Sequence, residues 1–353
     1  MTTPPTDYKL RKTRHELTRE VSDYITFIQK EQGIRVFVVA DENTQSLLPE
    51  FPVDLVLGAG EEYKDLRSAH RIWLSMASRG ICRNDLLLAI GGGTVTDICG
   101  FVAANYKRGC RLAFIPTTLL ALIDASVGGK CGVDLPMQSS DQNIKNLLGT
   151  FYPPEVVFGC VELVRESRHL FQEGLAEAIK CYCLFSKDPT ALFSGDSDLY
   201  EMVRRCIEYK QSLVEQDPYD RSVRQYLNLG HTVGHALEGL ALAEGRPISH
   251  GRAVAAGLVI EGYFSYVLEG FPQGHLLRLG EWVQSFIAPV HFSCDDYDRL
   301  WAHALQDKKN LTNPKGQVTC TLLKDFGAPL YGAGVGRKLW DEGLDFYKDL
   351  MRI

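Results

Sequence analysis

The sequence predicts an α/β fold, with a Rossmann-like nucleotide-binding domain over residues 1–155 and a mostly α-helical domain over residues 156–353. In the first half, short apolar runs alternate with amphipathic helical patterns, which is the rhythm of β-α-β units around a parallel sheet. From about residue 160 the strand-like runs disappear and long helical patterns dominate. A length of 353 residues suits two domains.

The expected elements follow one another along the chain. In the first domain we expect strands at residues 35–41, 53–60, 85–90 and 111–118, and helices at residues 65–80 and 94–104. Pro153 and Pro154 exclude a helix, so an extended connector joins the two domains there. In the second domain, helical patterns cover residues 173–186, 199–216 and 231–245.

Composition excludes several classes of partner. The net charge of -6 comes from 38 basic and 44 acidic residues that are mixed along the chain, without the basic block of a nucleic-acid or anionic-membrane surface. No stretch reaches the roughly 20 apolar residues of a membrane span, and the N-terminus lacks the apolar run of a signal peptide. The ten cysteines form no C-x-x-C pair. We therefore expect a cytoplasmic protein with reduced thiols.

A glycine-rich turn, Gly91-Gly92-Gly93, separates the strand at residues 85–90 from the following helix. Glycines let backbone N–H groups approach a pyrophosphate at a helix N-terminus. Thr96 stands where the dinucleotide fingerprint has its third glycine, so the turn alone leaves a nucleotide site and a simple tight turn open. Asp97 favours the nucleotide, because its carboxylate can meet a sugar hydroxyl.

Polar residues also end two other predicted strands, at residues 41–43 and 60–64. Nucleotides bind at the carboxyl ends of parallel strands, so both segments are candidate nucleotide contacts. A solvated loop is the alternative for each.

The second domain holds a candidate metal site. His231 and His235 are four residues apart, so both imidazoles lie on one face of a helix, and His250 follows after a loop. Thr232 stands where a metalloprotease keeps its general base, which argues against peptide hydrolysis. Glu177, His231 and His250 can supply three zinc ligands with open positions. Polar positions on solvated helices are the alternative.

Several basic residues stand in apolar or glycine-rich surroundings. As a buried group they need anions, and a substrate with both a phosphate and a carboxylate supplies them. Surface lysine is the alternative for each one. These candidates are Lys130, Lys145, Lys210, Arg224, Lys308 and Lys309.

Eight motifs, in this order, resemble those of the sugar phosphate cyclases and, within that superfamily, the 3-dehydroquinate synthase family. The resemblance runs from about residue 35 to residue 325. It implies the dehydroquinate synthase-like form of the predicted fold. The motifs are GEEYK, GGGTVTDICGFVAANYKRG, IPTTLLALIDASVGGK, KNLLGTFYPP, GLAEAIK, NLGHTVGHALE, HGRAVAAG and DKKN.

The resemblance implies NAD as the cofactor and Zn²⁺, with Co²⁺ as a substitute, as the metal. The implied metal ligands are Glu177, His231 and His250. The implied NAD-binding residues are Asp41, Asn43, Glu61, Lys64, Gly91, Gly92, Gly93, Asp97, Thr117, Thr118, Lys130 and Lys145.

The resemblance also implies a substrate site for a small sugar-acid phosphate. Arg108 is expected to reach the phosphate in a neighbouring subunit, which makes the working form a homodimer. The choice of an acid substrate depends on Lys210 and Arg224, which are placed as in members that use a carboxylate. The implied catalytic and substrate residues are Asp124, Lys130, Asn146, Lys180, Lys210, Arg224, Asn228, His235, Arg108 and one of Lys308 and Lys309.

The implied reaction turns 3-deoxy-D-arabino-heptulosonate 7-phosphate into 3-dehydroquinate and phosphate, a step of the shikimate pathway to aromatic amino acids. It proceeds by transient oxidation by NAD, phosphate elimination, re-reduction and an intramolecular aldol closure. The family is therefore one of carbon-oxygen lyases. The protein's task in it is to hold one conformer and stabilise charge.

The chain departs from the family pattern in a few places. Residues 137–144 form an insertion near the expected phosphate and cofactor, and Cys131, Arg165, Asp220 and Arg252 replace typical residues. Three alternatives stay open: another sugar phosphate cyclase of the aminodehydroquinate type, an iron-type polyol dehydrogenase, or a silenced nucleotide-binding paralogue. A simple alcohol substrate has no anion that needs Lys210 and Arg224, so these two residues argue against the polyol dehydrogenase hypothesis.

Overall fold

The computed structural model describes residues 6–136, 143–166, 168–189, 198–306 and 316–353. The chain forms two compact units. The first comprises Met1–Phe171 with Asp198–Gln211, and the second Gln172–Ser197 with Ser212–Ile353. The predicted α/β and mostly helical halves are confirmed.

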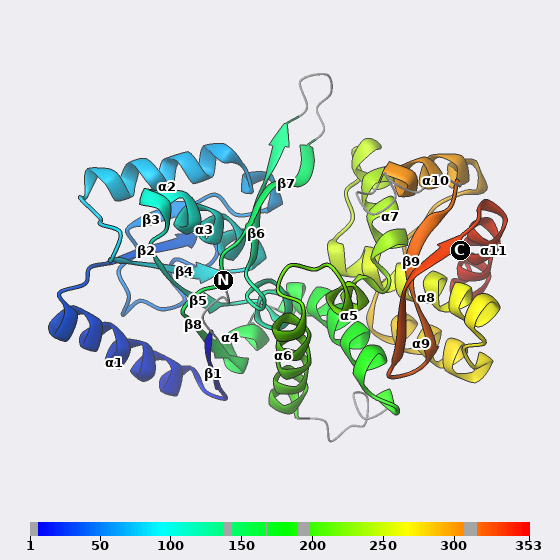
Figure 1. Ribbon diagram of the computed structural model, residues 1–353, viewed down its shortest axis with the longest axis horizontal. Coiled ribbons are helices and arrows are strands. Elements are labelled where there is room, and N and C mark those ends of the chain that lie inside the picture. The colour runs from blue at the N-terminus through cyan, green and yellow to red at the C-terminus, as the bar shows by residue number, and fades with distance from the viewer. Residues whose placement is uncertain (1–5, 137–142, 167, 190–197, 307–315) are drawn as a thin grey trace. The chain divides into compact units, whose positions relative to one another are not determined.

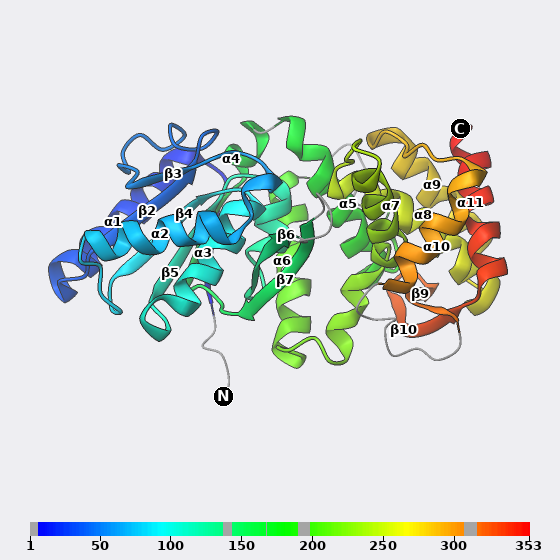
Figure 2. The same cartoon turned by 90° about the horizontal axis from the view of Figure 1, so that it is seen from above.

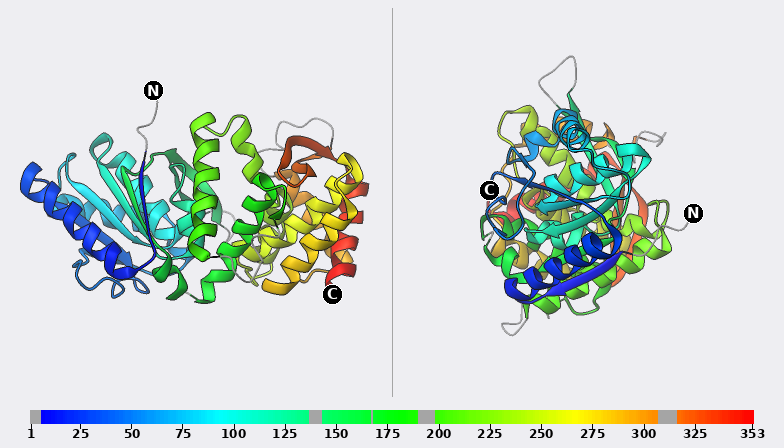
Figure 3. Two further views of the ribbon diagram at one scale, coloured as in Figure 1. Left: turned by 90° about the horizontal axis from the view of Figure 1, so that it is seen from below. Right: turned by 90° about the vertical axis from the view of Figure 1, so that its left-hand side faces the viewer.

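A six-stranded parallel sheet organises the first unit (Figure 1). Its strand order is β1-β8-β5-β4-β2-β3, and β1 lies at one edge (Figure 3). The strands are β1 Asp7–Arg11, β2 Val36–Asp41, β3 Leu55–Leu57, β4 Leu86–Gly91, β5 Arg111–Pro116 and β8 Val156–Cys160.

Helices cover both faces of this sheet (Figure 1). Along β2, Phe37 and Val39 pack with α2 (Leu66–Ser78) and α3 (Gly93–Asn105), whereas Val38 and Ala40 pack with α1 (Arg14–Gln32). Strands buried on both faces have continuous apolar sequences, which is why these runs could be recognised. Because the strands are parallel, their carboxyl ends meet at one edge of the sheet, where Asp41, Gly91 and Thr117 lie.

Two features of the first unit differ from the sequence-based expectation. β6 (Lys130–Pro136) and β7 (Asn143–Phe151) form an antiparallel hairpin that the sequence analysis did not predict. β8 pairs with β1 and β5, so the first unit continues beyond the boundary predicted at residue 155, through α4 (Val161–Glu166). The short helices here are η1 Glu61–Tyr63, η2 Tyr106–Arg108 and the π-helix η3 Ala121–Ala125.

The second unit is mostly helical (Figure 2). None of the described helices is long and apolar enough to cross a membrane. The helices that lie wholly or partly in this unit are α5 Arg168–Phe185, α6 Leu199–Gln216, η5 Val223–Asn228, α7 His231–Ala243, α8 His250–Glu269, α9 Gln273–Phe286, η6 Cys294–Asp296, α10 Tyr297–Gln306 and α11 Arg337–Met351.

The expectation that strands end near residue 160 was wrong for one hairpin. β9 (Val318–Asp325) and β10 (Ala328–Val335) pair antiparallel in the second unit. Two hydrogen bonds connect the hairpin to neighbouring helices. The Thr232 hydroxyl of α7 donates to the Thr319 carbonyl at 2.9 Å, and the Leu323 N–H donates to the Ser265 hydroxyl of α8 at 3.0 Å. A two-stranded hairpin needs such support to be stable.

α7 and α8 pack backbone against backbone. A Cβ atom on Gly257 would lie 1.9 Å from the Gly230 carbonyl oxygen, and one on Gly234 would lie 3.2 Å from the Ala253 backbone. Only glycine permits this approach at residue 257. Because α7 begins at His231 and α8 at His250, the contact fixes the distance between the two histidines.

We expect Gly257→Ala to lower the stability of the second unit strongly. The added methyl meets a backbone carbonyl rather than a flexible side chain, so the loss should be at least about 2 kcal/mol. Chemical denaturation followed by circular dichroism measures it. Gly274→Ala in α9 is the matched control, because nothing lies within 4 Å of its Cβ position. Equal midpoints for the two variants would contradict the assigned contact.

Candidate active site

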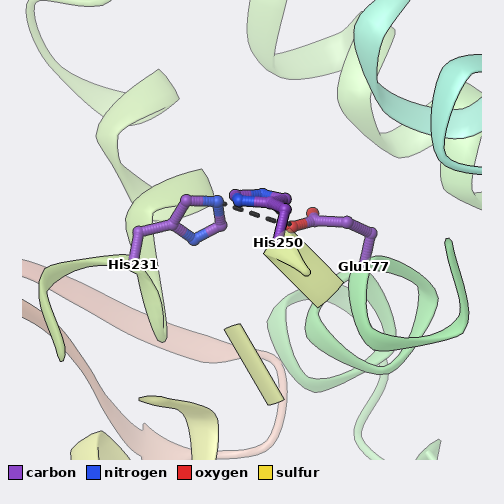
Figure 4. Close-up of side chains that lie close together, drawn as sticks. All are labelled: Glu177, His231 and His250. Carbon is purple, nitrogen blue, oxygen red and sulfur yellow. Dashed lines mark ion pairs between the residues drawn. The ribbon is translucent and has the colours of Figure 1, made fainter. Parts of the chain in front are cut away.

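Three predicted metal ligands converge in the second unit (Figure 4). Glu177 comes from α5, and His231 and His250 are the first residues of α7 and α8. Their candidate ligand atoms all lie within 4.8 Å of one another. Glu177 Oε1 is 3.4 Å from His231 Nε2 and 3.5 Å from His250 Nε2. The structure thus brings together the set expected from the sequence.

Hydrogen bonds at the far side of each imidazole orient the rings. His231 Nδ1 lies 3.0 Å from the Leu229 carbonyl oxygen, which can only accept, so Nδ1 carries the hydrogen and Nε2 offers its lone pair. His250 Nδ1 lies 3.4 Å from Glu238 Oε2. Such partners fix the tautomer of a metal-binding histidine and raise its basicity.

The charges of the cluster balance in the protein alone. Burial would raise the pKa of Glu177, but the ion pair with Lys180 and the hydrogen bond from His250 lower it to about 2. Burial would lower the pKa of His250, but the carboxylates of Glu177 and Glu238 raise it to about 10. A bound divalent cation would replace the proton of His250 as the counter-charge of Glu177.

The donor set fits the implied metal. Two imidazole nitrogens and one carboxylate oxygen are the ligands of many catalytic zinc sites, and they leave positions open for substrate or water. Co²⁺ accepts the same donors. His235 lies one helical turn beyond His231, and its ring centroid is 5.5 Å from that of His231 and 6.4 Å from that of His250. Of this i, i+4 pair, His231 therefore belongs to the candidate ligand set, and His235 is an exposed side chain beside that set.

Two buried carboxylates that the sequence analysis did not single out support this cluster. Glu238 orients His250 from α7. Glu261, which is fully buried in α8, accepts hydrogen bonds from the Gly230 N–H at 2.7 Å and the Val233 N–H at 3.0 Å, at the first turn of α7. A helix N-terminus favours an anion. The available signal was an ionisable residue inside the otherwise apolar run AAGLVIEGYF.

In the first unit, the glycine turn ends β4 and begins α3. Gly92 is the N-cap of α3, and the Thr117 N–H donates to the Gly91 carbonyl at 3.0 Å. A Cβ atom on Gly91 would lie 2.6 Å from that of Val95, so this glycine also permits close packing of helix on strand. The N–H groups of the first turn of α3 are suited to hold a pyrophosphate.

Three predicted NAD-binding residues form one network beside α3. Lys64 Nζ lies 2.6 Å from Asp97 Oδ2 and 3.6 Å from Glu61 Oε1. Burial would lower the pKa of Lys64, but the two carboxylates outweigh it and raise that pKa. The Thr94 hydroxyl donates to Glu61 at 2.8 Å. Lys64 is therefore a cation at neutral pH.

Other predicted NAD residues have structural contacts of their own. Asp41 Oδ1 accepts hydrogen bonds from the N–H groups of Asn43 and Thr44 at 3.0 and 2.9 Å, which closes the turn after β2. The Thr118 hydroxyl accepts from the Ala121 N–H at 3.1 Å. Lys145 is exposed on β7. The NAD contacts of these residues stay predictions.

The predicted substrate residues of the first unit lie on five elements, which are η2, η3, β6, β7 and α6. Lys210, buried on α6, has its Nζ 2.5 Å from Asp124 Oδ1 and 2.6 Å from the Asp124 carbonyl oxygen. Asn146 has φ 50°, and its N–H donates to Asp134 at 2.7 Å. Lys130 is exposed on β6 and Arg108 on η2.

The basic residues do not form one buried group. Lys210 and Arg224 are buried, whereas Lys130 and Lys145 are exposed. Arg224 lies on η5, where its Nη1 donates to the Pro218 carbonyl at 2.9 Å, and Asn228 ends that helix. Lys308 and Lys309 lie outside the described residues.

Comparison with known proteins extends these findings. The family described as 3-dehydroquinate synthase N-terminal matches residues 54–170, and that described as 3-dehydroquinate synthase C-terminal matches residues 174–310. A 3-dehydroquinate synthase of Parabacteroides distasonis is 36% identical over 96% of this chain and 97% of its own length.

Solved structures share the fold. A 2-epi-5-epi-valiolone synthase from Streptomyces hygroscopicus, with NAD⁺ and Zn²⁺ bound, has a TM-score of 0.82 at 21% identity and covers 99% of this chain and 98% of its own. A 2-deoxy-scyllo-inosose synthase, complexed with carbaglucose-6-phosphate, NAD⁺ and Co²⁺, has a TM-score of 0.79 at 23% identity and covers 95% of each chain.

The fold, the cluster of Glu177, His231 and His250, and these relatives define the class of protein: it is an enzyme of the sugar phosphate cyclase type. Within this class, the chain belongs to the 3-dehydroquinate synthase family, because both family domains match and a relative is 36% identical over nearly the whole chain. The resemblance seen in the eight motifs is confirmed.

We expect Glu238→Gln to weaken zinc binding about 10- to 100-fold, because the amide is a poorer partner for His250 Nδ1–H than the carboxylate. Competition with a chromophoric zinc chelator measures the affinity. Glu281→Gln, an exposed position on α9, should leave it unchanged. If both variants bind zinc like the parent protein, Glu238 does not orient the ligand.

Proposed function

We propose that this chain catalyses the 3-dehydroquinate synthase reaction, the conversion of 3-deoxy-D-arabino-heptulosonate 7-phosphate to 3-dehydroquinate and phosphate. The glycine turn would hold NAD, which would supply reversible oxidation of a secondary alcohol, and Glu177, His231 and His250 would hold a zinc ion able to polarise a substrate oxygen. The homologous family and its curated relatives support the reaction. The proposal places the protein among phosphate-eliminating lyases of the shikimate pathway.

The observation that carries the acid substrate is the burial of Arg224. Arg224 is 2% exposed, and its Nη1 donates to the carbonyl of Pro218, which holds the guanidinium in place. A guanidinium cannot lose its proton, and it pairs with a carboxylate through two parallel hydrogen bonds. A substrate carboxylate is the anion that suits this position.

The protein's own residues would hold and orient the reactants. Glu177, His231 and His250 would bind the metal, with Lys180 as the counter-charge of Glu177. Lys64 and Asp97 lie beside the first turn of α3, where the nucleotide would bind. Lys210 and Asp124 form a polar pair that can position substrate hydroxyl groups. By holding the substrate in one reactive conformer, such groups would lower the entropic cost of reaching the transition state.

The first test is release of inorganic phosphate from 3-deoxy-D-arabino-heptulosonate 7-phosphate by the purified protein with NAD and zinc. We expect release that stops when a chelator removes the metal and when NAD is omitted. Arg224→Ala should lower kcat/KM roughly 10- to 100-fold, the value of a hydrogen bond to a charged group.

Arg221→Ala is the matched control, because it removes an exposed arginine three residues away. A folded, zinc-loaded parent protein that releases no phosphate from this substrate would refute the proposed function. Release from a heptulose 7-phosphate instead would assign the chain to another cyclase substrate.

The homodimer is part of the proposal, as is a cytoplasmic location. Lys107, Arg108 and Gly109 have φ values of 49°, 66° and 111°, a backbone path that presents the exposed Arg108 at the end of η2. Lys107 Nζ anchors this path at the Ile81 carbonyl, 2.8 Å away. This geometry supports a role for Arg108 in the active site of a second copy.

Mixing inactive variants tests the shared site. Arg108→Ala and Arg224→Ala should each be weakly active alone. After subunit exchange, a mixed dimer would contain one site with both arginines intact, so activity should rise toward about a quarter of the parent value for random pairing of an equimolar mixture. Phosphate release before and after exchange measures this rise. No gain in a mixture that light scattering shows to be dimeric would exclude a contribution of Arg108 across the dimer.

A further inference from the structure

The carboxylate of Asp217 closes the turn that follows α6. Oδ1 accepts a hydrogen bond from the Arg221 N–H at 2.9 Å, and Oδ2 accepts from the N–H groups of Ser222 and Arg224 at 2.6 and 3.2 Å. Asp217 is buried, and its own N–H donates to the Leu213 carbonyl at 2.8 Å. The carboxylate of Asp217 therefore binds three backbone N–H groups of the turn 218–224, those of residues 221, 222 and 224.

The turn depends on this carboxylate for its shape. Asp220 has φ 58°, a left-handed conformation that costs a non-glycine residue roughly 1–2 kcal/mol. Hydrogen bonds from backbone N–H groups to a carboxylate are among the stronger ones and can offset that cost. Burial would raise the pKa of Asp217, but these N–H groups lower it, so the group is an anion at neutral pH.

Both the backbone and the guanidinium of Arg224 are hydrogen-bonded to residues at the start of this turn. Its backbone N–H donates to Asp217, and its Nη1 donates to the carbonyl of Pro218, the next residue. The side chain is buried, so the guanidinium has little freedom to change rotamer. A binding group that is fixed before the ligand arrives loses less entropy on binding.

We propose that Asp217 is a positioning residue for Arg224, and that it thereby sets the preference of the enzyme for a substrate with a carboxylate. The inference rests on the proposed function, in which Arg224 binds that carboxylate. Asp217 does not touch the substrate. It acts through the backbone of the turn 218–224 and through the Pro218 carbonyl that this turn presents to the guanidinium.

The test compares two phosphorylated sugars that differ in the carboxylate. For each variant, phosphate release gives KM and kcat for 3-deoxy-D-arabino-heptulosonate 7-phosphate, and inhibition of that release gives Ki for a heptulose 7-phosphate, which has no carboxylate. Asp217→Asn replaces one acceptor oxygen by an NH₂ group that faces N–H donors. We expect it to raise KM for the acid about tenfold while Ki for the heptulose phosphate changes less than about twofold.

Three variants frame this result. Arg224→Ala should show the same selective loss. Glu215→Gln, which removes an exposed carboxylate two residues before Asp217, should change neither constant. Asp217→Glu keeps the charge but displaces the acceptors, so a smaller selective rise in KM is expected. This last variant decides the question if thermal melting shows that Asp217→Asn does not fold.

An Asp217 variant that folds and changes both constants equally, or changes neither, overturns the positioning role. Failure of the proposed function looks different, because the parent protein itself would then release no phosphate from the acid. Selective loss in Asp217→Asn and Arg224→Ala, with an unaffected Glu215→Gln, establishes the role.

Discussion

The contact between the backbones of α7 and α8 is the constraint on which the metal site depends. His231 and His250 are the first residues of these helices, so the distance between the helix starts sets the distance between the rings. Gly257 allows α8 to approach the Gly230 carbonyl, and Glu261 of α8 binds two N–H groups of the first turn of α7. Metal ligands must be held within about 0.5 Å of a productive geometry. The contact at Gly257 helps to do this because there the main chain of α8 meets the Gly230 carbonyl directly, with no side chain of residue 257 to change rotamer.

Buried charges recur through both units, and each has a partner on the same or a neighbouring element. Glu177 pairs with Lys180 one helical turn away, Lys64 with Asp97, and Lys210 with Asp124. Buried ion pairs contribute little net stability, because desolvation costs about as much as the attraction returns. Their value here lies in position. Each pair fixes a charged group beside a place where an anion or a cation is expected, so the ligand would meet an ordered partner.

The sequence predicted those parts of the molecule whose signal is local. Strands buried on both faces, such as residues 36–41 and 86–91, read as apolar runs, and the glycines after β4 marked the turn. The ligand set could be proposed because His231 and His235 are four residues apart on one helix face and because the motifs resemble those of a known family. Glu261, Asp217 and the β9–β10 hairpin were missed. Their roles arise from hydrogen bonds to the backbone of another element or of a loop, and such bonds leave no periodic pattern in the sequence.

The candidate metal ligands and the predicted nucleotide contacts belong to different units. All three candidate metal ligands, together with Glu238, Glu261 and Lys180, belong to the second unit. The glycine turn and the network of Lys64, Glu61 and Asp97 belong to the first. The contacts described above for each set lie within its own unit. In the second unit, Arg224 is likewise held by its own turn, through its backbone N–H at Asp217 and its Nη1 at the Pro218 carbonyl.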